Sequence, residues 1–361
     1  MSTTKVLHVI ARMNVGGTAR YVGELVEKIP NSSLATGFVQ GAEIEDPLIA
    51  DFKLHRIPHL GRKISPVHDF RAWLELRTLI RNEKPDILHT HTFKAGLLGR
   101  LVPGDHKRVH TFHGHLFGDQ SLSPLAKKLI VIAERFLASR SDLLISVGKK
   151  VGREIQLAGI GRNLRWVSIP PGVTPLPRLD KKLAREALSL NQDDFTFGWM
   201  ARMTSVKNPH LMLEVARELP QFTFIMAGGG ELLESVRSEA PANVLVNGWA
   251  DSSIFWSAVD CAISTSDNEG MPIALIEAQL AHLPVIATNV GAISEVIENG
   301  VTGIITPKDQ IDLVLACKKL AADFQLRDAM ATNAAMNSTR KFGLHEMLWR
   351  HSLIYNNLIQ N

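Results

Sequence analysis

The sequence predicts an α/β fold with two doubly wound domains, and three observations carry this prediction. Short apolar runs bounded by turn residues alternate with longer helical patterns along the whole chain. The segment Ile169–Pro177 has four prolines in nine residues and interrupts this rhythm, which then restarts. The length of 361 residues also exceeds what one hydrophobic core usually serves.

Continuous apolar runs in the first half predict strands of a parallel sheet that is covered on both faces. These runs are Val6–Ala11, Leu34–Val39, Ile87–Thr90, Arg108–Phe112, Leu143–Val147 and Trp166–Ile169. Helical patterns lie between them at Ala19–Ile29, Asp69–Asn82, Lys94–Leu101, Pro124–Ser139 and Lys149–Leu157.

The same alternation returns after the proline-rich segment. We expect strands at Phe195–Met200, Thr223–Ala227, Val244–Asn247, Cys261–Thr265, Val285–Thr288 and Gly303–Ile305. We expect helices at Pro209–Glu218, Glu231–Ala240, Ile273–Ala281, Ser294–Glu298 and Gln310–Ala321. The predicted domains are residues 1–171 and 172–340, with a helix over 341–361 that packs back on the first domain. Two such domains would leave a ligand-binding cleft between the carboxyl ends of their sheets.

Composition limits the class of protein. A hydrophobic content of 45% and a charged content of 21% exclude a disordered or fibrous chain. Cys261 and Cys317 are too few for a disulfide framework or a cysteine metal cluster, so we expect buried thiols in a cytosolic protein. The N-terminus is typical of a strand rather than a signal peptide, and no apolar run reaches the roughly 18 residues of a membrane span.

The two halves carry opposite net charges. Residues 1–172 hold 25 Lys and Arg against 15 Asp and Glu, a net charge of +10. Residues 173–361 hold 15 against 21, a net charge of −6. This asymmetry indicates that the two domains have different partners.

Two predicted strands end in glycine clusters, at Val15–Gly17 and at Gly228–Gly230. We expect helices to open directly after them, at Thr18 and Glu231. A glycine-rich turn that enters a helix lets backbone N–H groups meet an anion, although a tight turn alone would also explain either cluster. Neither cluster matches the dinucleotide fingerprint, and no P-loop motif occurs, so a nicotinamide cofactor is not expected.

Paired carboxylates and paired cations follow two strands of the second domain. Glu269 and Glu277 have seven residues between them, and Pro272 suits the first turn of the helix that carries Glu277. Such carboxylates accept hydrogen bonds from the vicinal hydroxyls of a sugar and a ribose. Arg202 and Lys207 follow the strand Phe195–Met200 and are suited to a diphosphate between those two groups, although they would otherwise pass for solvated surface cations.

These motifs together resemble a known family. They are Val15–Gly17, Thr111–His115, Arg202 with Lys207, Ala227–Gly230, Glu269 with Glu277, and Leu283–Gly291 followed by Glu295. In this order, across nearly the whole chain, they are similar to the retaining, nucleotide-sugar-dependent glycosyltransferases of family 4. The resemblance implies the GT-B fold, two Rossmann-like domains, and a role in cell-surface polysaccharide synthesis.

The resemblance also implies site residues. Glu277 would bind the ribose, Arg202 and Lys207 the diphosphate, and Glu269 the transferred sugar. The remaining donor contacts would come from Gly16, Gly17, Gly229, Gly270, Met271, Pro272 and Ile273. His113 would contact the sugar near the reacting centre, and no metal or other cofactor would be needed. Departures from the family occur at Asn208, His282 and Ala292, where smaller residues are common.

The resemblance further implies that stereochemistry at the anomeric carbon is retained. Because no carboxylate nucleophile is evident in the first domain, we expect front-face attack assisted by the leaving phosphate rather than a covalent intermediate on Glu269. The main catalytic task is then to stabilise negative charge on the leaving group.

Histidines cluster in two short motifs, His89-Thr-His91 and His113-Gly-His115. Their spacing of two residues invites a metal, but no carboxylate or cysteine ligand lies nearby, so zinc is not expected. A histidine at a strand end is also often purely structural, and the roles of His89, His91 and His115 stay open.

Basic residues of the first half suggest an acceptor-facing surface. Arg71, Trp73, Arg77, Arg81 and Lys84 fall on one predicted helix whose apolar residues Leu76, Leu79 and Ile80 can face the core. With Arg62, Lys63, Lys127 and Lys128 they would form a surface for anionic lipid headgroups, unless they are merely solvated helix faces. A lipid-linked glycan acceptor and peripheral attachment at the inner face of the plasma membrane would follow. No nucleic-acid module is found, so that partner is not expected.

The sequence thus favours a hexosyltransferase that moves a sugar, expected from a UDP-sugar, to a glycan or lipid-linked acceptor. A GT-B sugar-nucleotide epimerase or phosphorylase is one alternative, although a phosphorylase would need a lysine-bound pyridoxal site that has no marker here. A nucleotide-sugar-binding protein without turnover is the other.

Overall fold

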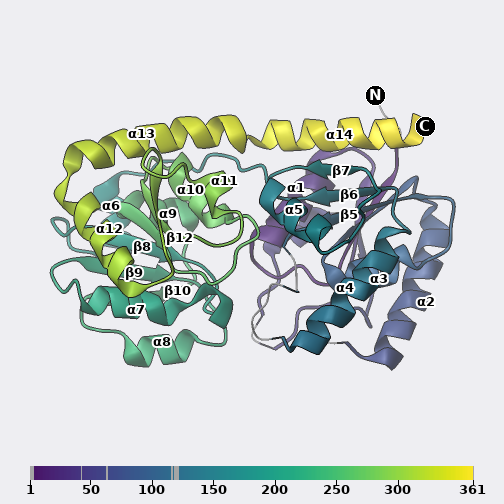
Figure 1. Cartoon of the computed structure of the whole chain (residues 1–361), viewed down its shortest axis with the longest axis horizontal. Coiled ribbons are helices and arrows are strands. Elements are labelled where there is room, and N and C mark those ends of the chain that lie inside the picture. The colour runs from purple at the N-terminus through teal and green to yellow at the C-terminus, as the bar shows by residue number, and fades with distance from the viewer. Residues whose placement is uncertain (1–3, 42, 62–63, 115–116, 118–121, 361) are drawn as a thin grey trace. The chain divides into compact units, whose positions relative to one another are not determined.

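The computed structural model describes residues 4–41, 43–61, 64–114, 117 and 122–360. The chain forms two compact units. The first comprises Met1–Gly172 together with Leu344–Asn361, and the second comprises Val173–Gly343. Each contains one parallel sheet with helices packed against it (Figure 1). The predicted class of two doubly wound α/β domains is therefore confirmed.

The first unit has a seven-stranded sheet with the order β3-β2-β1-β4-β5-β6-β7. Its strands are β1 (Val6–Ile10), β2 (Ser32–Thr36), β3 (Leu54–Arg56), β4 (Ile87–His91), β5 (Lys107–Phe112), β6 (Leu143–Ser146) and β7 (Trp166–Ser168). Its helices are α1 (Gly17–Lys28), the short 3-10 helix η1 (Pro47–Asp51), α2 (Pro66–Glu83), α3 (Phe93–Arg100), α4 (Pro124–Ala138), α5 (Lys149–Leu157) and α14 (Leu344–Gln360).

Strand residues of the first unit alternate between two buried faces of the sheet. Leu7, Val9 and Leu88 pack with α2 and α3 in one apolar cluster. The intervening residues of β1 and β4 point to the opposite face, where His8 and His89 lie against Tyr355 of α14. A helix from the far end of the sequence therefore completes the core of the first unit.

The second unit has a six-stranded sheet with the order β10-β9-β8-β11-β12-β13. Its strands are β8 (Thr196–Met200), β9 (Thr223–Ala227), β10 (Val244–Gly248), β11 (Cys261–Ser264), β12 (Val285–Thr288) and β13 (Gly303–Thr306). Its helices are α6 (Lys181–Ala187), η3 (Ser205–Lys207), α7 (Pro209–Arg217), α8 (Leu233–Glu239), α9 (Ser252–Ala258), α10 (Ile273–Leu280), α11 (Ile293–Val296), α12 (Gln310–Ala322) and α13 (Phe324–Lys341).

Two apolar clusters fill the two faces of the second sheet. One contains side chains of α6, α9, α10 and α11, such as Phe255 and Ile276. The other contains side chains of α7, α8 and α12, such as Leu213 and Leu313. Both cysteines are free and buried in the second of these clusters, as the composition predicts.

Every strand and helix that the apolar pattern predicts is present, with ends that shift by a few residues. The pattern misses β3, α6, α9 and α13. Among the described residues, no helix is long and apolar enough to cross a membrane.

Candidate functional site

The strand order of the second sheet reverses between β8 and β11. Chain segments leave these neighbouring strands in opposite directions, which opens a crevice at their carboxyl ends where ligands of such sheets bind. Arg202 and Lys207 follow β8, and Glu269 follows β11. The topology therefore brings three of the predicted site residues to one edge of the sheet.

Lys207 and Glu269 form an ion pair in this crevice. Nζ of Lys207 lies 2.6 Å from Oε1 of Glu269, and the Ser266 hydroxyl donates to the same oxygen at 2.7 Å. The Glu269 side chain is 7% exposed and that of Lys207 is 20% exposed, so the pair is shielded yet reachable. Ser266 was not among the predicted site residues, although it lies only three positions before Glu269.

A second set of hydrogen bonds holds the loops after β8 and β11 together. The amide of Asp267 donates to the carbonyl of Val206 at 2.9 Å, and the Thr265 hydroxyl donates to the carbonyl of Asn208 at 2.8 Å. These bonds fix the backbone on both sides of Lys207. The ammonium group is thus held in place by the protein before any ligand binds.

The conformation and contacts of Asn208 explain why asparagine can stand where glycine is common in the family. Its φ of 47° lies in the left-handed region, which glycine and asparagine adopt more readily than other residues. Its side chain also donates to Oδ1 of Asp267 at 3.1 Å and accepts from the amide of Leu211 at the start of α7. Asparagine therefore supplies the turn that glycine would allow and adds a link to the β11 loop.

The glycine cluster after β9 packs against the loop after β8. A Cβ at Gly228 would collide with the carbonyl of Ala201, and one at Gly230 would meet the carbonyl of Met203. A Cβ at Gly229 would collide with the Trp249 ring. Close packing within the protein therefore accounts for these glycines, and α8 begins at Leu233 rather than at the predicted Glu231.

Helix α10 carries the second carboxylate of the predicted pair. Pro272 lies immediately before the helix rather than in its first turn, and the helix begins at Ile273 after Gly270 and Met271. Glu277 is one turn further along and is 4% exposed. Nε1 of Trp256 donates to its Oε2 at 3.5 Å.

Gly291, in the loop after β12, lies directly against the backbone of Glu269. Its φ is 49°, and a Cβ at this position would collide with the carbonyl oxygen of Glu269. The backbone of Glu269 can take this position only because residue 291 has no side chain.

In the first unit, Gly16 and Gly17 lie at the N-terminus of α1. The helix begins at Gly17, one residue before the predicted Thr18, and Gly16 has a φ of 150°. No side chain accepts a hydrogen bond from the first amides of this helix. Such an end favours an anion.

His113 belongs to a row of histidines that the sequence did not predict as a unit. Its Nε2 lies 3.1 Å from Nδ1 of His91, whose Nε2 lies 3.1 Å from Nδ1 of His8. The Tyr21 ring packs edge-on against His113 with the ring centroids 4.9 Å apart. His115 lies outside the described residues.

Helix α14 joins this row through two further hydrogen-bonded side chains. The Tyr355 hydroxyl lies 2.6 Å from Nδ1 of His89, and the Tyr21 hydroxyl lies 3.1 Å from Nε2 of His351. Since Nδ1 of His351 donates to the carbonyl of Met347, its neutral ring accepts from Tyr21. Sequence patterns could not pair residues that lie hundreds of positions apart.

Burial keeps these histidines uncharged at neutral pH. Desolvation lowers the pKa of His113 to about 3, with a smaller contribution from His351. Desolvation is also the main cause that lowers the pKa of His91 well below its ordinary value. His113 can therefore exchange hydrogen bonds with a ligand as a neutral ring.

His8, His89 and His91 each bring one ring nitrogen within 4.8 Å of the others, which is close enough for a shared metal ion. However, both ring nitrogens of His89 already contact hydroxyl groups, those of Tyr355 and Thr111. Within the described part of this cluster, Nε2 of His8 is the buried ring nitrogen without a partner. The donor set therefore fits a hydrogen-bond network better than a metal centre, and metal-independent action stays a prediction.

The basic surface expected on α2 is present only in part. Leu76 and Ile80 are buried, whereas Arg71 and Arg81 are exposed. Lys84 is exposed but is not on the helix as expected, because α2 ends at Glu83 and Lys84 follows it in a left-handed conformation. Arg62 and Lys63 lie outside the described residues.

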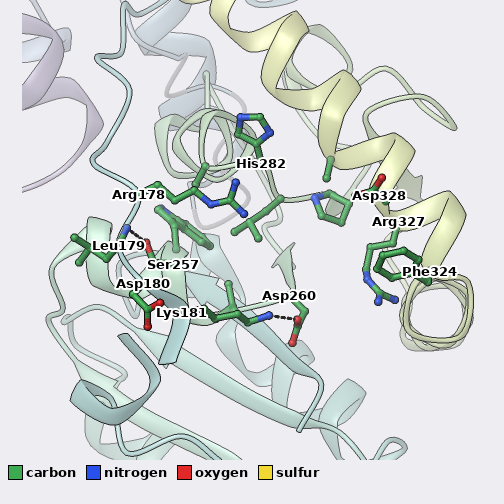
Figure 2. A pocket seen from close by; sticks show the side chains of 16 residues that line it. Arg178, Leu179, Asp180, Lys181, Ser257, Asp260, His282, Phe324, Arg327 and Asp328 are labelled. Atoms are coloured by element: carbon green, nitrogen blue, oxygen red, sulfur yellow. Dashed lines mark hydrogen bonds and ion pairs between the residues drawn. The ribbon is translucent and has the colours of Figure 1, made fainter. Parts of the chain in front are cut away.

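A hollow of about 610 Å³ lies at the other edge of the second sheet, where the chain enters β11 and β12. Figure 2 shows Lys181 paired with Asp260 within it. Nζ of Lys181 lies 2.5 Å from Oδ1 of Asp260. Asp260 also accepts from Arg185 and from the amide of Thr196, both at 2.8 Å. Its charge is therefore used to hold the fold, and this hollow is not the candidate site.

Two family models match the chain. A glycosyl transferase 4-like domain matches residues 16–172, and glycosyl transferases group 1 matches residues 180–336. The chain is 26% identical to the UDP-Gal:α-D-GlcNAc-diphosphoundecaprenol α-1,3-galactosyltransferase of Escherichia coli, over 100% of this chain and 98% of the relative. It is 22% identical to the capsular polysaccharide biosynthesis glycosyltransferase CapM of Staphylococcus aureus, over 85% of both.

Solved structures give the same fold. The Anabaena protein HepE in complex with UDP-glucose superposes with a TM-score of 0.84 at 18% identity, over 98% of this chain and 99% of that one. The sucrose-phosphate synthase of Thermosynechococcus elongatus does so with a TM-score of 0.84 at 17% identity, over 99% of both. The chain therefore belongs to the group 1, family 4-like glycosyltransferases and has the GT-B fold, as its sequence predicts.

Proposed function

We propose that the protein transfers a hexose from a UDP-sugar to a glycan carried on a lipid diphosphate, with retention at the anomeric carbon. The observation that carries this proposal is the buried Lys207–Glu269 pair at the point where the order of the second sheet reverses. Support for the substrates comes from two similar proteins. One is named for transfer from UDP-Gal to a diphosphoundecaprenol-linked sugar, and the other was solved with UDP-glucose.

The donor contacts follow from the chemistry of each residue. Glu277 would accept hydrogen bonds from the two ribose hydroxyls, which a carboxylate can do with both oxygens. Arg202 and Lys207 would hold the diphosphate, and Glu269 would accept from hydroxyls of the transferred sugar. The backbone N–H groups of Gly270, Met271 and Ile273 would meet phosphate oxygens at the start of α10, where no side chain caps the helix, and Pro272 would contact the donor without donating.

The reaction would proceed on one face of the sugar. The bond between the anomeric carbon and the phosphate oxygen breaks, the acceptor oxygen bonds to that carbon, and its proton passes to the leaving phosphate. Lys207 and Arg202 would stabilise the charge that develops on the UDP. Glu269 is a poor nucleophile here, because one of its oxygens already accepts hydrogen bonds from Lys207 and Ser266.

From the first unit, we assign His113 to a hydroxyl of the transferred sugar. Its lowered pKa makes it a neutral partner rather than a cation. Gly16 and Gly17 would approach the diphosphate or the acceptor. The positive charge of the two cations and the helix N-termini would take the place of a metal ion.

A lipid-linked acceptor implies work at a membrane surface, and we propose peripheral attachment to the inner face of the plasma membrane. Its support here is chemical: the acceptor named for the similar E. coli enzyme is α-D-GlcNAc-diphosphoundecaprenol, a sugar carried on a lipid diphosphate. No nucleic-acid partner is proposed.

A donor screen tests the function. The protein is incubated with UDP-, GDP- and ADP-sugars and a panel of lipid-diphosphate glycans, and nucleotide release and product are measured. We expect UDP release that depends on the acceptor. Epimerised donor without acceptor would indicate an epimerase, and donor binding without turnover across the panel would indicate a binding protein.

A further inference from the structure

Helix α4 is apolar on its exposed face as well as on its buried face. Large apolar side chains form a stripe on its exposed face, at spacings of four, three and four residues along the helix. These residues are Leu125, Leu129, Ile132 and Phe136, which are 67%, 58%, 51% and 51% exposed. We call them the α4 stripe.

The buried face of α4 carries a charge beside the apolar residues Leu137 and Ala138. Glu134 is 3% exposed, and its Oε2 accepts from Arg100 of α3 at 2.8 Å. This ion pair fixes which side of α4 faces the core, because an unpaired buried carboxylate would be costly. The Glu134–Arg100 ion pair therefore holds the α4 stripe on the outer side of the helix.

Cations border the α4 stripe along one flank and at its C-terminal end. Lys128 and Arg135 are exposed on the helix, and Arg140 follows it with its guanidinium 5.0 Å from the centre of the Phe136 ring. The acid on this helix, Glu134, is the buried and neutralised one. The exposed face of α4 thus combines apolar side chains with positive charge and offers no negative charge.

A second set of exposed apolar side chains lies at the start of α2. Val67, Phe70 and Leu74 are 62%, 61% and 40% exposed at helical spacing. Helices α2 and α4 both pack against α3. All three follow strands of a parallel sheet, so they begin at the same edge of it.

We propose that the α4 stripe inserts into the interface of an anionic phospholipid bilayer, with α4 lying in the membrane plane. A helix with an apolar face bordered by Lys and Arg is suited to that boundary, and its 15 residues are too few to cross a bilayer. A second copy of the chain is a worse fit, because a symmetric contact would set the same cations against one another. For its biological purpose this inference rests on the proposed lipid-linked acceptor.

The attachment would then have two components, apolar insertion and attraction between cations and lipid headgroups. Salt screens only the second. We therefore expect binding to vesicles of equal parts phosphatidylglycerol and phosphatidylcholine that weakens at high salt but persists. Vesicles of phosphatidylcholine alone should bind less protein.

The test compares two matched pairs of substitutions by sedimentation with those vesicles. Leu125→Asp with Leu129→Asp should lower the partition coefficient by roughly tenfold or more. Ile311→Asp with Leu315→Asp on α12 is the control, because these residues are also four positions apart and are 73% and 56% exposed. The control should bind as the unchanged protein does. Circular dichroism checks that both variants fold.

A fluorescent label tests insertion directly. Since Cys261 and Cys317 are buried, an Ile132→Cys variant can be labelled selectively at residue 132 with a polarity-sensitive dye. We expect its emission to shift to shorter wavelength with the vesicles. An unshifted dye, equal loss of binding in both pairs, or binding that high salt abolishes would overturn the proposal. So would a dimer in solution that the Leu125→Asp, Leu129→Asp variant dissociates.

Donor binding is measured on the same proteins without vesicles. Because α4 belongs to the first unit and the Lys207–Glu269 pair to the second, the Leu125→Asp, Leu129→Asp variant should bind UDP-sugar as the unchanged protein does. Loss of membrane binding with donor binding intact would concern α4 alone. Absence of donor binding in the unchanged protein would concern the proposed function and leave the vesicle result standing.

Discussion

The ammonium of Lys207 lies 2.6 Å from a carboxylate oxygen of Glu269, and this contact joins the loop after β8 to the loop after β11. The family resemblance implies separate roles for the two residues, Lys207 at the diphosphate and Glu269 at the sugar. Their direct contact means that the cation is already aimed at the carboxylate that would hold the sugar. A bound diphosphate would contact Lys207 while Lys207 still contacts Glu269. The Lys207–Glu269 pair would then bind both the diphosphate and the transferred sugar.

Replacing Lys207 tests this pair. We expect Lys207→Ala to lower kcat by roughly 10²–10³, because a preorganised charge at the leaving group is lost. Thermal unfolding should change far less. The matched control is Lys308→Ala, which removes a more exposed lysine that pairs with Asp267 at 3.2 Å. Unchanged turnover in Lys207→Ala would remove that residue from the diphosphate site.

Two glycines separate backbone strain from damage to the site. Gly291 and Gly300 both have positive φ, 49° and 81°, so alanine is strained at either position. A Cβ at Gly291 would collide with the backbone of Glu269, whereas one at Gly300 meets nothing within 4 Å. We expect transferase activity to collapse in Gly291→Ala and to survive in Gly300→Ala. Equal activity in the two variants would show that the position of Glu269 does not matter.

The proposed ribose contact of Glu277 predicts a change in donor affinity. Glu277→Gln removes a charge-assisted acceptor, which is worth about 1.5–3 kcal/mol. We therefore expect the KM for UDP-sugar to rise by roughly 10- to 100-fold, while KM for the acceptor stays unchanged. Glu298→Gln is the control, since Glu298 is exposed and bonds to Asn337. A donor KM that is the same in both variants would contradict the assignment.

The buried histidines predict that acid weakens the first unit. Desolvation lowers the pKa of His8 to about 3 and that of His351 to about 4, from an ordinary 6.5. As pH falls below 6.5, these histidines therefore bind protons in the unfolded chain but stay neutral in the folded chain. Stability is complete above that pH and declines below it, by about 1.4 kcal/mol per pH unit for each such histidine.

The second unit is the internal control for this prediction. Its two histidines, His210 and His282, are not buried. Hydrogen exchange, corrected for its intrinsic rate at each pH, should show the amides of β1 and β4 losing protection between pH 7 and 5 before those of β8 and β11. Parallel loss in both units would contradict the histidine origin.

The alternation of apolar runs and helical patterns was enough to predict both sheets, because strands buried on both faces need continuous apolar residues. It missed β3, whose three residues are only half-buried. It missed α13, in which polar and apolar residues follow no strong period. Local patterns also predicted α4 but not its orientation, which depends on a buried partner, Arg100, far from it in sequence.

The candidate site was predicted where local motifs carry the chemistry. Arg202, Lys207 and Glu269 follow the strand ends after which the sequence predicts them, and Glu277 lies inside α10, as the sequence also predicts. The partners that hold these residues were not predicted. Ser266 and Asn208 form hydrogen bonds that depend on the conformation and packing of the loops after β8 and β11. The periodicity of a sequence does not predict such loop packing.

Helix α14 makes the first unit discontinuous in sequence. Residues 344–361 complete a core whose other residues precede Gly172, and Tyr355 contacts His89 inside it. During synthesis from the N-terminus, this core must wait for its last helix until the second unit has been made. A cut at the proline-rich segment would therefore remove α14 from the first unit. A fragment that ends at this segment would lack the helix that completes its core.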